Sequence, residues 1–417
     1  MPLKSIDLFA GCGGLTRGLE WAGFDCVSFN ELNEDAAKSF STNFPNAIPF
    51  VGDISEVLTN EKILENKFHE MDIDVVCGGP PCQGFSGIGH RRAYTSIQKE
   101  QIKTNHLYNE MIRVIGLIKP KTFLFENVQG LLSSRWNSSG MKGDIFRDVL
   151  QAFSSIKGYT IQPTLQHAYD FGVPQNRPRV FILGIRNDIL EKIDLNPTDF
   201  NSSQDSSKFP SELRRNGGFF EGLIKRPYPS IIEAISDLAY DDWEEGQTYR
   251  HGPDSDYQKF MREGIGEPWH KMKLTDHHVS KHTKKVKERF KWMIDHGVSK
   301  MSDLPEEMQT NKFSQKVLPE EWGNDRPSIT CLSNSDDYIH YSQPRALSVR
   351  EWARLQSFPD IHEFCGPRTT GGKRRAGDPT KPGTRDVPRY TQIGNAVPPL
   401  VGFALGTLIK NIIQGTV

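Results

Sequence analysis

The stretch Gly78-Gly-Pro-Pro-Cys-Gln83 breaks an apolar run with two glycines, two prolines and a thiol. The apolar residues before it, Ile73–Cys77, predict a short buried strand. Glycine permits positive φ or close approach of a ligand, and proline fixes φ and lacks an N–H donor, so no helix begins here. The pattern predicts a rigid elbow that fixes the Cys82 thiol, followed by a flexible stretch, Gly84–Gly89. A structural loop with an incidental buried cysteine is the alternative.

Length and composition limit the class of protein. The 417 residues are enough for two domains, and a net charge of −1 argues against a generally basic nucleic-acid coat, so phosphate binding would need local patches. The six cysteines form no CxxC pair, which favours a reducing compartment. No signal-peptide pattern is present, and no apolar run approaches the roughly 20 residues that span a bilayer. We expect a soluble intracellular protein.

The first predicted elements of the chain are a strand, a glycine-rich turn and a helix, the order found where nucleotide-like cofactors bind. Lys4–Phe9 predicts a strand, Ala10–Gly14 a glycine-rich turn, and Leu15–Ala22 a helix. Small residues at such a turn let a nucleotide-like ligand lie against the backbone. A tight strand-to-helix connection without a ligand is the alternative, since the turn reads GxGG and not GxGxxG.

Acidic side chains follow the next two predicted strands. Phe24–Phe29 leads to Glu31, and Ala47–Phe50 leads to Asp53. A carboxylate after the second strand can accept hydrogen bonds from ribose hydroxyls. One after the third can accept from the amino group of adenine. A single acid at such a position is more often a helix cap or a solvated loop residue, but the repetition of acids at successive strand ends favours a cofactor site.

Further elements follow the elbow. The pattern predicts helices at His106–Ile118 and Asp144–Ile156, and strands at Lys121–Phe125, Tyr159–Leu165 and Arg179–Ile185. Glu126 comes directly after one of these strands. Gln175, Arg177 and Arg179 alternate, so on an extended chain their side chains share one face.

Beyond residue 188 the chain is charged and irregular. Lys281–Lys291 holds six Lys/Arg against one acid, which suits phosphates better than most charge runs do. The nearby His277, His278 and His282 lack cysteine partners or HExxH spacing, so we expect no metal. Helices are predicted at Ser348–Ser357 and Pro399–Ile413. Between them lies Gly366–Arg389, a glycine- and arginine-rich insert that we expect to be a loop.

The whole set of motifs resembles the DNA (cytosine-5)-methyltransferases, in the order that this family has them. The motifs are Asp7–Gly14, Asn30-Glu31, Gly52-Asp-Ile54, Gly78–Gln83, Glu126-Asn-Val128, Gln175-x-Arg-x-Arg179, Arg345–Glu351 with Arg354–Pro359, and Gln392–Pro399. Each motif is short, but their common order makes a chance match negligible.

The resemblance implies an α/β fold with a mostly parallel, Rossmann-like sheet that binds S-adenosylmethionine. The expected catalytic domain is 1–188 completed by 386–417, and 189–385 is the expected target-recognition domain with the basic insert 366–389. The implied cofactor-binding residues are Phe9, Gly11, Gly14, Glu31, Asp53, Ile54, Pro80 and Asn395. Leu32 occupies a position that can hold an aromatic residue in the family, so adenine is expected to pack on Phe9 and Ile54.

The resemblance also implies the chemistry. A thiolate, Cys82, adds to C6 of cytosine, so that C5 becomes nucleophilic enough to take a methyl group. Glu126 in its protonated form relieves charge at N3, while Arg177 and Arg179 hold O2 and organise the pocket. The target base must leave the helix to reach the thiol. The implied DNA-binding residues are Gln83, Ser86, Gln175, Thr330, Lys373, Arg374 and Arg375.

Three alternatives differ in substrate or activity. A nicotinamide-dependent Rossmann enzyme would use the glycine turn and Glu31 but leaves Cys82 and Glu126 without a function. A tRNA methyltransferase of the same fold typically has proline after the Cys-Gln pair, where this chain has Gly84, and a shorter recognition region. A silent DNA-binding relative is disfavoured because Cys82 and Glu126 are both present.

The expected setting is a bacterial restriction-modification system or an orphan methyltransferase, because a chain this short has no room for regulatory domains. We expect a cytoplasmic monomer that binds double-stranded DNA, is held at the nucleoid through it, and binds no membrane.

Overall fold

The computed structural model of the protein describes residues 2–57, 68, 71–81, 103–137, 139–193, 218–240, 248–263, 268–298, 303–309, 315–323, 326–331, 337–369 and 386–416. Six residues singled out by the sequence lie outside these ranges: Cys82, Gln83, Ser86, Lys373, Arg374 and Arg375.

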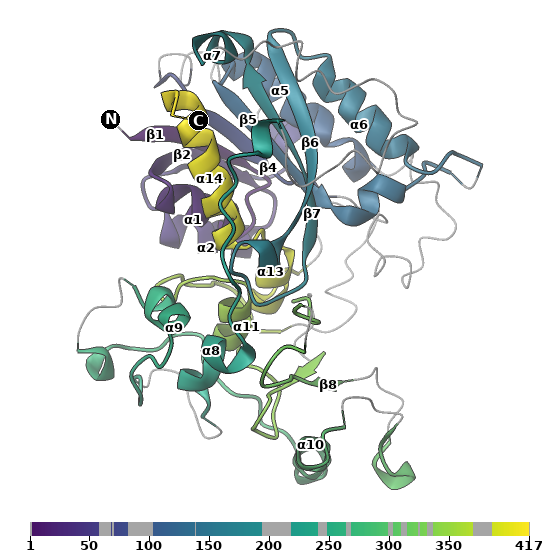
Figure 1. The fold of residues 1–417 in the computed structure, drawn as a ribbon, viewed down its shortest axis with the longest axis vertical. Helices are drawn as coiled ribbons and strands as arrows, with labels where there is room; N and C mark the ends of the chain where they lie inside the picture. The colour runs from purple at the N-terminus through teal and green to yellow at the C-terminus, as the bar shows by residue number, and fades with distance from the viewer. Residues whose placement is uncertain are drawn as a thin grey trace.

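A seven-stranded sheet forms one half of the molecule, in the strand order β3-β2-β1-β4-β5-β7-β6 (Figure 1). Its strands are β1 (Leu3–Leu8), β2 (Phe24–Glu31), β3 (Ile48–Val51), β4 (Val75–Gly78), β5 (Thr122–Val128), β6 (Tyr159–His167) and β7 (Pro178–Arg186). All neighbouring pairs are parallel except those that β7 makes with β5 and β6. The mostly parallel sheet predicted from the sequence is confirmed.

Both faces of the sheet are covered by helices, so its central strands are apolar on both sides. On β5, Phe123 and Phe125 pack toward one helical layer and Leu124 packs toward the other. The first layer contains α3 (Ile54–Val57), α5 (Tyr108–Ile118) and α6 (Asp144–Ser154). The second layer contains α1 (Gly14–Trp21), α7 (Asn187–Lys192) and α14 (Pro399–Gln414). A further helix, α2 (Glu34–Asn43), packs its Phe40 on Phe29 of β2.

The last helix returns to the start of the chain. Helix α14 packs directly against α1, and the two termini lie near each other (Figure 1). Among the described residues, Arg389–Gln414 is the one helical stretch long and apolar enough to cross a membrane, and most of its apolar window is buried inside the protein. This packing identifies α14 as a core helix of the sheet half.

Two of the differences between predicted and observed boundaries bear on the site. The strand predicted at Lys121–Phe125 spans Thr122–Val128 in the structure, so Glu126 belongs to β5. The reason is the antiparallel neighbour β7, which pairs Val128 with Arg179 and so extends the ladder beyond Phe125. The predicted helix from His106 is preceded by a 3-10 turn, Lys103–His106, and its α-helical part begins at Tyr108.

The other half consists of short elements joined by irregular chain (Figure 1). They are α8 (Ile231–Ile235), α9 (Asp256–Met261), α10 (Lys284–Asp295), β8 (Lys316–Val317), β9 (Tyr338–Ile339), α11 (Val349–Leu355) and α13 (Arg389–Asn395). The division into a catalytic domain and a target-recognition domain stays a prediction.

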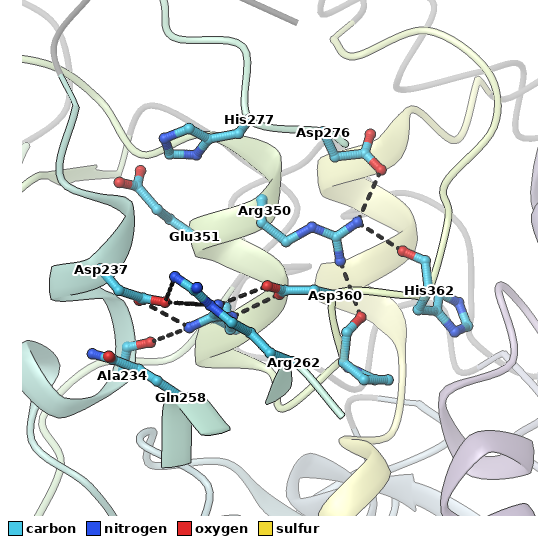
Figure 2. Close-up of polar contacts among 12 residues, drawn as sticks. Ala234, Asp237, Gln258, Arg262, Asp276, His277, Arg350, Glu351, Asp360 and His362 are labelled. Carbon is cyan, nitrogen blue, oxygen red and sulfur yellow. Dashed lines mark hydrogen bonds and ion pairs between the residues drawn. The ribbon is translucent and has the colours of Figure 1, made fainter. Parts of the chain in front are cut away.

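Within this half, a buried ion network fastens α11 to the segments around α8 and α9 (Figure 2). Arg354 donates to both carboxylate oxygens of Asp237 and of Asp360, and Arg262 donates to Asp237 as well. Tyr249 adds a hydrogen bond to Asp360 at 2.5 Å. Two acids thus meet two guanidinium groups, so each buried charge has a partner, which is the condition under which burial of charge is tolerated.

A second cluster holds the ends of the basic insert. Arg350 donates to Asp276 and to the carbonyl of His362 (Figure 2). Asp276 also pairs with Arg389 at 2.8 Å, and Arg368 donates to Ser280 Oγ at 3.0 Å. The insert was expected to be a basic loop over its whole length, but Arg368 and Arg389 are committed to protein partners, and Arg389 begins α13. Residues 370–385 of the insert lie outside the described ranges.

Candidate active site at the carboxyl ends of the strands

The elbow after β4 lies against Glu126 of the neighbouring strand. Parallel pairing places Gly78 beside Phe125, so the next residues of the two chains meet. A Cβ on Gly79 would lie 2.7 Å from Glu126 Oε2, which leaves room for glycine only. Asn127 Nδ2 donates to the carbonyl of Pro80 at 3.2 Å. The chain is therefore held as far as Pro80, two positions before Cys82.

Glu126 and Arg179 form a buried ion pair, with Glu126 Oε1 at 2.8 Å from Arg179 Nε. The antiparallel register of β5 and β7 brings the two side chains together, since Val128 pairs with Arg179. Burial raises the pKa of the Glu126 carboxyl, while the Arg179 and Arg177 guanidinium groups oppose that rise. A carboxyl of this kind keeps a protonated share closer to neutral pH than an exposed glutamate does.

Arg177 and Gln175 connect distant parts of the chain. The two Nη groups of Arg177 donate to the carbonyls of Cys331 and Gly394, at 3.0 and 2.7 Å. Gln175 accepts from the Cys331 N–H at 3.1 Å and donates to the Leu355 carbonyl at 2.8 Å. Their shared contact with Cys331 agrees with the predicted common face. Gln175 is fully buried, so its predicted DNA contact finds no support in this conformation and stays a prediction.

Thr330, next to Cys331, also bonds to the loop that precedes β7. Its Oγ1 donates to the Asn176 carbonyl at 2.6 Å, and the Asn176 N–H donates to the Ile329 carbonyl at 2.7 Å. The loop before β7 is thus joined to the 328–331 segment by main-chain and side-chain bonds. Thr330 is half-buried, and the predicted contact with a target phosphate is untested by these bonds.

A second set of groups lines the ends of β1 and β2. The N–H groups of Gly11 and Asn33 donate to the two carboxylate oxygens of Glu31, each at 2.8 Å. Burial raises the pKa of Glu31, and these N–H donors oppose the rise. Gly11 has φ +57°, and a Cβ added to it would meet no atom within 4 Å, so this turn has open space beside it. Phe9, just before it, is half-buried and also has positive φ.

Of the other predicted cofactor residues, Asp53 keeps a carboxylate oxygen for a ligand, whereas Ile54 and Gly14 pack against the rest of the protein. Asp53 Oδ1 accepts from the N–H and the hydroxyl of Ser55, so it caps α3 and keeps Oδ2 for another donor. Ile54 is 2% exposed and belongs to the core. A Cβ on Gly14 would lie 2.3 Å from the Val397 carbonyl, so Gly14 packs against the chain that follows Asn395.

Two exposed apolar side chains lie at this edge, and only Leu32 was singled out from the sequence. Leu32 is 39% exposed and Val51 is 43% exposed. Val51 pairs with Glu31 in the parallel register of β2 and β3, so it lies beside the same strand end. Both residues follow predicted strands, and that position was the signal available in the sequence.

A buried acid under the glycine turn was also not singled out. Asp7 is 2% exposed and accepts a hydrogen bond from Thr16 Oγ1 at 2.6 Å. Burial raises the pKa of Asp7 to about 7. Because Thr16 lies in α1, this bond fixes the helix relative to β1 and hence the shape of the turn between them.

The fold and this site place the protein among the α/β enzymes that work at the carboxyl ends of a parallel sheet. Residues 3–411 match the family model of the C-5 cytosine-specific DNA methylases, so the chain belongs to that family. The predicted family and fold class are confirmed, and the protein is a DNA (cytosine-5)-methyltransferase.

Named relatives agree with this assignment. The chain is 34% identical to the type II methyltransferase M.DdeI of Desulfomicrobium norvegicum, over 98% of this chain and 88% of that protein. It is 29% identical to the type II methyltransferase M.AgeI of Thalassovita gelatinovora, over 98% and 99% of the two chains. Its fold resembles that of an E. coli prophage protein described as a DNA modification methyltransferase, with a TM-score of 0.66, 23% identity and 99% coverage of both chains.

Proposed function

We propose that the protein methylates C5 of a cytosine turned out of duplex DNA, with Cys82 as the attacking thiol. The observation that carries this proposal is the contact between the Gly79 turn and the buried Glu126–Arg179 pair. It supports a site in which the residue two positions after Pro80 and the Glu126 carboxyl act on one base.

The ends of β1, β2 and β3 suit S-adenosylmethionine. The open side of Gly11 lets a ligand approach the backbone, and Glu31 retains lone pairs for ribose hydroxyls. Asp53 Oδ2 would accept from the adenine amino group, and the exposed Leu32 and Val51 would cover the ring together with Phe9. When bound, S-adenosylmethionine supplies an electrophilic methyl group. Gly14, Ile54, Pro80 and Asn395 stay in the proposal as residues that shape this site.

The protein's own residues would activate the base. The Cys82 thiolate would add to C6, which makes C5 nucleophilic enough to take the methyl group. Transfer of the C5 proton to water would then restore the C5–C6 double bond and expel the thiolate. Glu126, whose pKa burial raises, would donate a hydrogen bond to N3 in its protonated form as charge develops there. Arg179 holds Glu126 and would donate to O2. Arg177 acts mainly by organising the pocket, since both of its Nη groups hold main-chain carbonyls.

We propose further that the protein is the modification enzyme of a restriction-modification system. Its relatives M.DdeI and M.AgeI are named type II methyltransferases, and each match covers nearly the whole of this chain. Such an enzyme protects DNA at the sequence that a cognate nuclease would cut.

The proposed substrate is tested with purified protein and labelled S-adenosylmethionine. We expect label in duplex DNA, and bisulfite sequencing of DNA from expressing cells should show one recurring sequence with a protected cytosine. Label in tRNA but not in duplex DNA would favour the tRNA enzyme of the same fold. No label in either, with cofactor bound, would favour the silent relative.

Glu31→Ala and Asp53→Ala are expected to weaken cofactor affinity before they affect turnover at saturation. Each removes an acceptor of charge-assisted hydrogen bonds, worth about 1.5–3 kcal/mol, so the expected loss is about ten- to a hundredfold in Kd. Calorimetric titration measures it. The exposed Glu34→Ala is the matched control and should bind like the parent. Unchanged affinity in both test variants would refute the placement of ribose and adenine.

A further inference from the structure

Helix α10 presents a basic outer face in the half of the molecule away from the sheet. Its inner face is apolar: Phe290 and Met293 pack against Leu304 and Ile339. Lys284, Lys285, Lys287 and Lys291 are exposed on the outside. The charge run that the sequence analysis noted at Lys281–Lys291 is therefore a true helical surface and not an irregular segment.

The charges on α10 oppose the stability of the helix itself. The N-terminal end of a helix favours acids and the C-terminal end favours bases. Here the first turn has no acid and begins with Lys284 and Lys285, while the last turn has no base and ends with Asp295. Lys285 and Arg289 add a like-charge pair one turn apart, which is also unfavourable. Local rules of this kind are broken most often at functional positions.

Two pairs on the helix offset this cost only weakly. Lys284 lies 3.9 Å from Glu288, and Lys291 lies 3.2 Å from Asp295. All four side chains are well exposed, so each pair contributes on the order of a few tenths of a kcal/mol. The surface keeps an excess of positive charge at its N-terminal end.

Arg289 is a buried guanidinium with very little compensation. The residue is 7% exposed, and its Nε has no hydrogen-bond partner in the described part of the chain. Its Nη2 reaches Gln315 Oε1 at 3.5 Å, and the guanidinium lies 5.4 Å from the centre of the Phe290 ring. No carboxylate among the described residues forms an ion pair with it. An arginine cannot lose its charge in a protein, so this position favours an anion as an additional partner.

Contacts connect α10 to the segments that border the proposed site. Ile339 of β9 packs on α10, and the hydroxyl of the preceding residue, Tyr338, accepts from the Thr330 N–H at 3.2 Å. The chain leading into α10 holds the insert, because Arg368 donates to Ser280 Oγ. The described start of the basic insert therefore lies beside the chain that enters α10.

We propose that the outer face of α10, formed by Lys284, Lys285 and Lys287, with the largely buried Arg289 one turn from Lys285, is a phosphate-contact surface. It holds duplex DNA through the backbone and does not read the bases. The inference rests on the proposed function, in which duplex DNA is the substrate, and adds a second contact area to it. Lysine is suited to this task, since it contacts phosphate as a point charge without fixed geometry.

The test is a triple substitution of Lys284, Lys285 and Lys287 by glutamine, with DNA affinity measured over a salt series. Each lost phosphate contact reduces the salt slope by about 0.9, so we expect a slope shallower by about two to three units. Affinity should fall equally for target and non-target duplexes, while Kd for the cofactor and turnover at saturating DNA stay unchanged. The control removes the same charge from the sheet half, with Lys157, Lys192 and Lys410 replaced by glutamine, and should keep the parent's slope.

A salt slope equal to the parent's in the triple variant would overturn the proposal. So would a loss confined to the target duplex, because that result would make the face a base reader. A parent protein that neither binds nor methylates duplex DNA would instead defeat the proposed function, so the two failures are distinguishable.

Arg289→Met separates DNA contact from a structural function. Methionine keeps the apolar contact with Phe290 and removes a buried charge that lacks a carboxylate, so the melting temperature of the free protein should stay level or rise. DNA affinity should fall with a shallower salt slope. A lower melting temperature with unchanged DNA affinity would show that Arg289 is structural and contributes nothing to DNA binding.

Discussion

Cys82→Ala is expected to abolish methyl transfer to DNA while leaving cofactor affinity largely intact. The thiol is proposed to form the bond to C6, and alanine offers no nucleophile in its place. The approach to Cys82 should persist in the variant, because Gly79 packs on Glu126 and the Pro80 carbonyl is held by Asn127. Labelled-methyl transfer and calorimetric titration measure the two properties separately.

Duplex DNA with 5-fluorocytosine at the target gives an independent readout of the same step. Fluorine cannot leave as a proton does, so the parent protein should be trapped as a covalent adduct with DNA, and Cys82→Ala should not. Cys365→Ala, at a half-buried cysteine in contact with Thr42, is the matched control and should behave like the parent. A Cys82→Ala protein that still methylates DNA would exclude the mechanism.

The fold could be predicted from the sequence where local patterns carry it. The strand predicted at Phe24–Phe29 and the observed β2 both begin at Phe24. The helix predicted at Pro399–Ile413 matches α14 to within one residue. The alternation of apolar residues in strands and their helical periodicity involve only residues close in the sequence, so a single sequence is enough to detect them. The boundary of β5 was missed because Glu126 is held in the strand by β7, more than fifty residues later.

In the candidate site too, features that depend on neighbouring residues could be predicted, and long-range contacts could not. The strand-end position of Glu31 was visible in the sequence, and the structure confirms that it lies beside the glycine turn through its bond to Gly11. The partners of Arg177 were not visible, since Cys331 and Gly394 lie 154 and 217 residues further along the chain. The alternation of Gln175, Arg177 and Arg179 suggested one common task. In the structure, Arg179 pairs with the Glu126 carboxyl. Gln175 and Arg177 instead bond to the main chain at Cys331.

The ion pair with Arg179 determines how the acid at position 126 should respond to pH. A general acid works in its protonated form, so its rate contribution is present below its pKa and is lost as pH rises through it. Burial raises the pKa of Glu126, which extends activity toward neutral pH. Arg179 acts in the opposite direction, because its positive charge favours the carboxylate. Arg179→Met should therefore shift the alkaline limb of the kcat profile to higher pH, even though the maximal rate falls.

Glu126→Gln is expected to reduce kcat by roughly 10²–10⁴-fold, the usual effect of losing an acid–base group. Glutamine keeps the shape of the side chain beside Gly79 but has no proton that titrates, so the alkaline limb assigned to Glu126 should vanish from the profile. Cofactor affinity should barely change, because Glu126 lies on β5 and Glu31 on β2. Glu110→Gln, a half-exposed acid on α5 paired with Arg113, controls for the loss of one charge and should keep the parent's rate. Collapse of cofactor affinity with turnover at saturation preserved would show that Glu126 serves the cofactor and not the base.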